Sequence, residues 1–113
     1  EPGHDVVSGR LRGSSALSAV NLAEVVGKER AIGVHSDRLI AYLDLLAVAV
    51  YPFDTEQAIE VGEMKMATKP FGLSLGDLAC LTLGKRLNAP VLTADRAWAQ
   101  LNLGVEVVLI RPE

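Results

Sequence analysis

Aromatic residues and cysteines are scarce in this chain. Of its 113 residues, 4% are aromatic although 50% are hydrophobic, so a core must be built mainly from Leu, Val, Ile and Ala. Such a core suits an α/β domain with buried parallel strands. The one cysteine, Cys80, excludes an internal disulfide framework and fits a reducing cytoplasm. We expect Cys80 to be a small core residue.

Several other signals are absent. The longest apolar run, residues 45–51, is far shorter than the roughly 20 residues of a membrane helix, and neither a signal peptide nor a lipidation motif is present. Neither a Gly-rich phosphate loop nor a paired histidine spacing occurs. The net charge of −3 excludes wholesale attraction to nucleic acid, but it allows a local basic rim or a metal ion in an acidic pocket.

The apolar residues alternate between strand and helix periods over a length that suits one domain, residues 1–113. This alternation predicts an α/β fold with a parallel sheet. In one helix, the apolar residues expected to face inward are Leu39, Ile40, Leu43 and Leu46. The expected strands cover residues 14–17, 47–51, 90–94 and 105–110, and the expected helices begin and end near residues 3–11, 19–29, 38–46, 55–68, 75–88 and 95–102.

Residues 70–98 carry the most informative pattern. Ser74 is a good N-cap, and Asp77 three residues later completes a start that resembles a capping box. The helix that follows is apolar on most sides and should be covered on most sides. A short strand then delivers Asp95 at its carboxyl end, where ligands bind in open α/β sheets.

The acidic residues each allow a plain structural interpretation as well as a functional one. Asp77 lies on an apolar stripe without a nearby basic partner, so it either caps its helix or belongs to a site. Asp95 either caps the next helix or points into the same crevice. Glu24 and Lys28 are four residues apart and would form an ordinary surface pair.

Three stretches taken together resemble a PIN-domain ribonuclease, and more narrowly the VapC-type toxins of bacterial toxin–antitoxin pairs. They read SALSAVNLAEVV (residues 15–26), FGLSLGDLACLTLGKRL (residues 71–87) and PVLTADRAW (residues 90–98). The resemblance extends over nearly the whole chain, in order and with the spacing of the family. It implies a three-layer α/β/α domain with a central parallel sheet.

The resemblance also implies a set of site residues. The acidic site of the family matches Glu24, Asp77 and Asp95 one by one, so these carboxylates would be catalytic and would bind metal. Thr93 matches a hydroxyl position of the same motif and would orient its neighbours. Candidates for a rim that contacts phosphates are Lys85, Arg86 and Arg96.

Clustered carboxylates repel one another and need a cation, and their hard oxygen ligands favour Mg²⁺ or Mn²⁺. Such an ion lowers the pKa of a bound water and stabilises charge on a phosphodiester during in-line displacement. The resemblance therefore implies RNA as substrate, cleaved to leave a 5′-phosphate. It further implies a cytoplasmic homodimer and a cognate antitoxin that projects a basic side chain into the acidic site.

The chain departs from the family pattern at its amino end. The first carboxylate of the family is an Asp at the end of an N-terminal strand that is central in the sheet, and no counterpart precedes the Glu-Pro-Gly turn of residues 1–3. We therefore expect an N-terminally incomplete domain, in which the strands at 14–17 and 90–94 flank a gap that this chain does not fill. The alternative function is a non-catalytic PIN-like module that binds RNA or protein.

Overall fold

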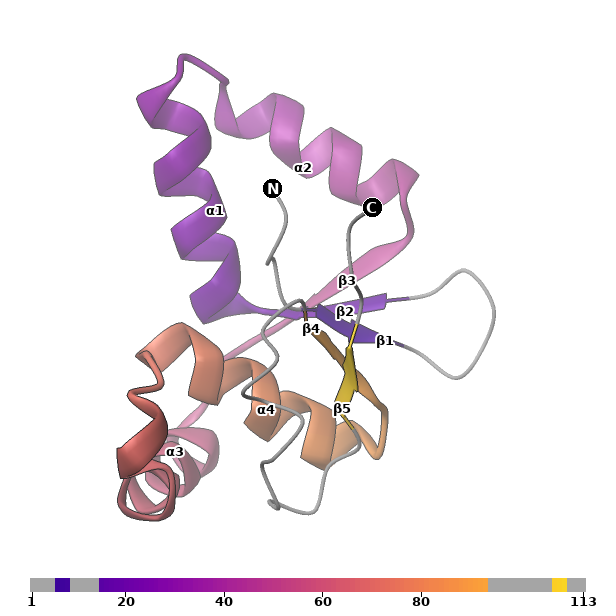
Figure 1. Cartoon of the computed structure of the whole chain (residues 1–113). Helices are drawn as coiled ribbons and strands as arrows, with labels where there is room; N and C mark the ends of the chain where they lie inside the picture. Colours follow the sequence, from indigo (N-terminus) through magenta and orange to yellow (C-terminus); the bar gives the residue numbers. More distant parts are fainter. Residues whose placement is uncertain (1–5, 9–14, 94–106, 110–113) are drawn as a thin grey trace.

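Helix α4 (Leu75–Leu87) lies at the centre of the molecule in the structure, a computed structural model that describes residues 6–8, 15–93 and 107–109 (Figure 1). Ser74 is its N-cap, and its hydroxyl oxygen accepts a hydrogen bond of 3.1 Å from the backbone N–H of Asp77. The carboxylate of Asp77 in turn accepts a bond of 2.9 Å from the N–H of Ser74. The helix ends at Asn88, whose φ of 51° is left-handed. The capping box and the helix end were both predicted correctly.

Five strands form one sheet in the order β3-β2-β1-β4-β5. Strand β2 pairs with β3 in parallel, and β4 pairs with β5 in parallel. Strand β1 lies between β2 and β4 and runs antiparallel to both. The bounds are β1 (Val6–Ser8), β2 (Ser15–Ser18), β3 (Val48–Tyr51), β4 (Val91–Thr93) and β5 (Val107–Leu109).

Strand β1 corrects two predictions. Residues 6–8 are a strand rather than part of a helix over 3–11, and they fill the position between β2 and β4 that we expected this chain to leave empty. Val7 pairs with Ala16 on one side and with Val91 on the other. A segment with two β-branched residues suits a strand, and a position between two strands satisfies its backbone on both sides. The sheet is therefore mixed, and the prediction of a fully parallel sheet is wrong.

Four of the predicted helices are present. They are α1 (Ala19–Ala31), α2 (Ser36–Leu45), α3 (Thr55–Ala67) and α4, and a short 3-10 helix, η1 (Lys69–Phe71), follows α3. The helix predicted over residues 95–102 lies outside the described residues. Ser18 and Asp54 accept hydrogen bonds from the first turns of α1 and α3. Figure 1 shows α1 and α2 on one side of the strands and α3 and α4 on the other. The α/β architecture is confirmed, and the full three-layer arrangement stays a prediction.

The core is built around α4. This helix packs against α3 and against β1, β2 and β4. Its buried residues are Gly76, Leu78, Ala79, Cys80, Leu81, Thr82, Leu83 and Gly84, as expected for a helix that is apolar on most sides. Cys80 is a buried core residue, as predicted. Within the described residues, no helix is long and apolar enough to cross a membrane.

Helix α2 differs from its prediction. Leu39 is buried, whereas Ile40 and Leu46, which were also expected to face inward, are 45% and 48% exposed. The reason is that, within the described residues, α2 packs mainly against α1 and β3. The described part of the chain therefore leaves an apolar surface open along α2.

The burial of α4 predicts how sensitive its leucines are to truncation. Leu81 is 0% exposed and Leu75, in the first turn of the same helix, is 54% exposed. We expect Leu81→Ala to lower the free energy of unfolding by about 2–5 kcal/mol, because it leaves a cavity. The same change at Leu75 should cost about 0.5 kcal/mol. Urea unfolding of both variants measures the difference, and equal losses would show that α4 is not the centre of the core.

Candidate functional site

A cavity of about 950 Å³ lies beside the first turn of α4. Glu24 of α1 and Asp77 of α4 both line it, together with Asn21 and Ser74. Another part of its wall is apolar and is formed by Leu39, Tyr42, Leu43, Leu46 and Val48. Two acids that are far apart in the sequence are thus brought to one cavity by the contact between α1 and α4.

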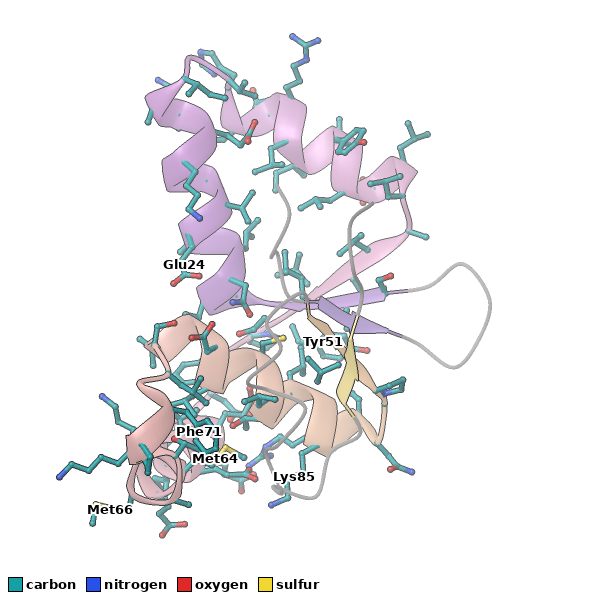
Figure 2. The ribbon with its side chains drawn as sticks, viewed as in Figure 1. Glu24, Tyr51, Met64, Met66, Phe71 and Lys85 are labelled. Atoms are coloured by element: carbon teal, nitrogen blue, oxygen red, sulfur yellow. The ribbon has the colours of Figure 1, made fainter. Side chains whose placement is uncertain are left out.

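Glu24 is exposed, and its side chain points from α1 toward the start of α4 (Figure 2). Its carboxylate occupies the space where a side chain at position 76 would begin. A Cβ atom at position 76 would lie 2.5 Å from Oε2 and 2.7 Å from Cδ of Glu24, so the flexible end of this side chain would have to move aside. The absence of a side chain at Gly76 therefore makes room for the Glu24 carboxylate.

Asn21 lies one helical turn before Glu24 and also contacts α4. Its Nδ2 atom donates a hydrogen bond of 3.0 Å to the backbone carbonyl of Gly76. Its Oδ1 atom is buried and has no hydrogen-bond partner among the described residues. A buried acceptor without a donor is costly, so this oxygen marks a place where the fold gives up stability.

Asp77 is half-buried and serves its helix through one of its two oxygens, Oδ2, which accepts from the N–H of Ser74. The structural interpretation of Asp77 as a capping residue is thus confirmed. The hydrogen bond from Ser74 uses the Oδ2 atom of Asp77, and Asp77 also lines the cavity with Glu24. A role for Asp77 in a site is compatible with its role in the capping box.

Both carboxylates lie near the positive end of the α4 dipole, which favours negative charge. They still repel each other, and carboxylate and amide oxygens are the donors that Mg²⁺ and Mn²⁺ prefer. Glu24 and Asp77 therefore fit part of a site for such an ion. Within residues 6–8, 15–93 and 107–109, no three Asp, Glu, His or Cys side chains cluster into a complete metal site.

The remaining predicted site residues are Thr93, Asp95, Arg96, Lys85 and Arg86. Thr93 is the last residue of β4, and Asp95 and Arg96 lie outside the described residues. Lys85 and Arg86 are in the last turn of α4, at the opposite end from Asp77. There the Nζ atom of Lys85 is 3.4 Å from Oε2 of Glu60, and the Nε atom of Arg86 is 3.3 Å from Oε1 of Glu60. These ion pairs join α4 to α3, and contact of the two cations with RNA stays a prediction.

Two residues of the site were not found from the sequence. Asn21 was assigned only to the polar face of α1, although its spacing of three from Glu24 puts both on one side of the helix. Gly76 directly precedes Asp77, and a glycine inside a helix is a signal of close approach by another group. Neither signal says which partner approaches, because that depends on how α1 crosses α4.

Comparison with known families gives one result. The model of a family described as the PIN domain matches residues 1–103, which is most of the chain. No curated protein and no solved structure matches the chain.

The two roles of Asp77 can be separated by substitution. Asp77→Asn keeps an acceptor for the N–H of Ser74 and loses only the charge, so we expect it to lower the free energy of unfolding by about 0.3–1 kcal/mol. Asp77→Ala loses the acceptor as well and should cost about 1–2 kcal/mol. Urea unfolding in the absence of divalent ions measures both values. Equal costs for the two variants would mean that the capping bond contributes nothing to stability.

Proposed function

The chain belongs to the PIN domain family, and from this membership we propose that it is a metal-dependent endoribonuclease that hydrolyses RNA phosphodiester bonds. PIN domains are generally nucleases, bind RNA and typically use divalent metal ions. We further propose that this one is the toxin of a type II toxin–antitoxin pair in the cytoplasm. The observation that carries the catalytic proposal is the meeting of Glu24 and Asp77 at one cavity.

We assign Glu24, Asp77 and Asp95 as the residues that hold Mg²⁺ or Mn²⁺. Glu24 and Asp77 supply carboxylate oxygens at the start of α4, and Asp95 follows β4 two residues after Thr93. The role proposed for Thr93 is to orient these neighbours. When bound, the ion lowers the pKa of a water molecule and offsets the negative charge of the phosphodiester.

The chemistry of the chain itself follows from these positions. The Glu24 carboxylate lies next to Gly76, where it can accept a hydrogen bond from the attacking water and orient it. The water oxygen forms a bond to phosphorus as the bond from phosphorus to the 3′-oxygen breaks. The products are a 5′-phosphate and a 3′-hydroxyl, because the proton lost by the attacking water passes to solvent and the leaving 3′-oxygen takes up a proton from solvent. Arg96, Lys85 and Arg86 are proposed to contact phosphates of the RNA.

The three carboxylates give the first test of this proposal. Glu24→Gln, Asp77→Asn and Asp95→Asn should each lower the rate of RNA cleavage in Mg²⁺ by about 10²–10⁴-fold, because each removes a charge that the reaction needs. Asp95→Asn should leave the fold intact and be no less stable without metal, because it relieves repulsion. Chelation by EDTA should stop cleavage, and added Mn²⁺ should restore it.

Glu63→Gln is the matched control, since Glu63 is exposed on α3 and does not line the cavity. It makes the same change of charge and should cleave RNA at the wild-type rate. Full Mg²⁺-dependent activity in Glu24→Gln or Asp95→Asn would contradict the assigned role. A wild-type chain that binds RNA but never cleaves it in Mg²⁺ or Mn²⁺ would favour a non-catalytic binding module.

The apolar wall of the cavity supports the proposal of an antitoxin. Tyr42 and Leu46 line the cavity and are 58% and 48% exposed, and the acids Glu24 and Asp77 line it on the side of α4. A partner segment that is apolar and carries an arginine would match both features. We also propose that the chain forms a homodimer. The edge strand β3, where Val50 and Tyr51 are 40% and 37% exposed, is the surface that supports this.

Co-expression with the small protein encoded beside this gene tests the partner. We expect the two to co-purify, the complex to lose RNA cleavage and Mn²⁺ binding, and substitution of one partner arginine by alanine to restore both. Light scattering gives the mass of the complex and of the chain alone, for which we expect twice 12.0 kDa. A partner that binds but leaves cleavage untouched would contradict the toxin assignment and favour a nuclease without an antitoxin.

A further inference from the structure

Gly76 differs from the other helical glycines whose surroundings are described. A Cβ atom added at Gly27 of α1 or at Gly62 of α3 would meet nothing within 4 Å. At Gly76 the same atom would overlap the Glu24 carboxylate. Gly76 is also buried, whereas Gly27 and Gly62 are exposed. Glycine is a weaker helix former than alanine, and at Gly76 it leaves space that the Glu24 carboxylate occupies.

Asn21 acts on the same point from the other helix. Its Nδ2 atom donates a hydrogen bond to the backbone carbonyl of Gly76. Gly76 is also the residue beside which the Glu24 carboxylate lies. To make this bond the side chain leaves its Oδ1 atom buried and unpaired. Asparagine is also a weak helix former compared with leucine or alanine. Two unfavourable choices, Asn21 on α1 and Gly76 on α4, thus meet at one contact.

We propose that Asn21 and Gly76 are positioning residues that fix the Glu24 carboxylate beside Asp77. Asn21 sets how closely α1 approaches the first turn of α4, and Gly76 leaves the space that the carboxylate occupies. Neither residue needs to touch the RNA. This inference rests on the proposed function, because it assigns the pair a part in holding the cation.

The contact itself is tested by thermal unfolding without metal, which does not depend on the proposed function. Gly62→Ala, the matched control in open space, should raise Tm by about 3–6 °C because alanine is the better helix former. Gly76→Ala should not raise Tm, because the new methyl group displaces Glu24. In the background of Glu24→Ala, where the carboxylate is gone, Gly76→Ala should raise Tm as Gly62→Ala does.

The positioning role is tested by Mn²⁺ binding to the full chain, followed by the electron paramagnetic resonance signal of free Mn²⁺. Gly76→Ala and Asn21→Leu should each weaken binding by about 10–100-fold, the usual effect of changing a group that orients a ligand. Gly62→Ala should leave binding unchanged. In the background of Glu24→Gln, Gly76→Ala should have no further effect, because both changes act through one carboxylate.

The outcomes separate the two claims. A rise in Tm for Gly76→Ala in the wild-type background would overturn the contact and with it the inference. An unchanged Mn²⁺ affinity in Gly76→Ala, with Tm behaving as expected, would make the pair a packing contact only and would overturn the positioning role. A wild-type chain that binds no Mn²⁺ would overturn the proposed function and this role together, and the Tm measurements would still report the contact.

Discussion

The burial of α4 is the constraint on which the rest of the structure depends. Its residues from Leu78 to Gly84 are all buried, so every neighbouring element must lie against it. The sheet covers one side and α3 another, where the Thr82 hydroxyl lies 3.6 Å from the sulfur of Met64. Helix α1 meets α4 at its first turn. The side chains around this turn therefore lie beside the core of the described part of the molecule.

The start of α4 then serves stability and function with the same groups. A helix start needs acceptors for its unpaired N–H groups and favours negative charge, and Ser74 and Asp77 supply both. A second carboxylate, that of Glu24 in α1, lies next to the same turn. The opposite end of α4 carries Lys85 and Arg86, which suit the negative end of the dipole. The charges along α4 are thus separated, and the acidic end is the one that faces the cavity.

The sequence was informative where the signal is local and uninformative where it depends on packing. The cap at Ser74, the end at Asn88 and the four helices between residues 19 and 87 follow from short-range rules, and they were predicted correctly. The strand at Val6–Ser8 was predicted to be part of a helix over residues 3–11. Its pairing with β2 and β4 is a long-range contact, which the local sequence does not show. The role of Gly76 was missed because a glycine shows that something approaches, and only the fold identifies Glu24. Asp95 was assigned from its place after a predicted strand and from the resemblance, and it lies outside the described residues.

The central claim is that Glu24 and Asp77 share one divalent cation at the first turn of α4. The most direct test is a crystal structure of the chain grown with Mn²⁺, in which anomalous scattering identifies the metal without reference to activity. The account predicts a manganese peak in contact with carboxylate oxygens of both residues. A well-ordered site in which Mn²⁺ is absent, or bound to either residue without the other, would contradict it.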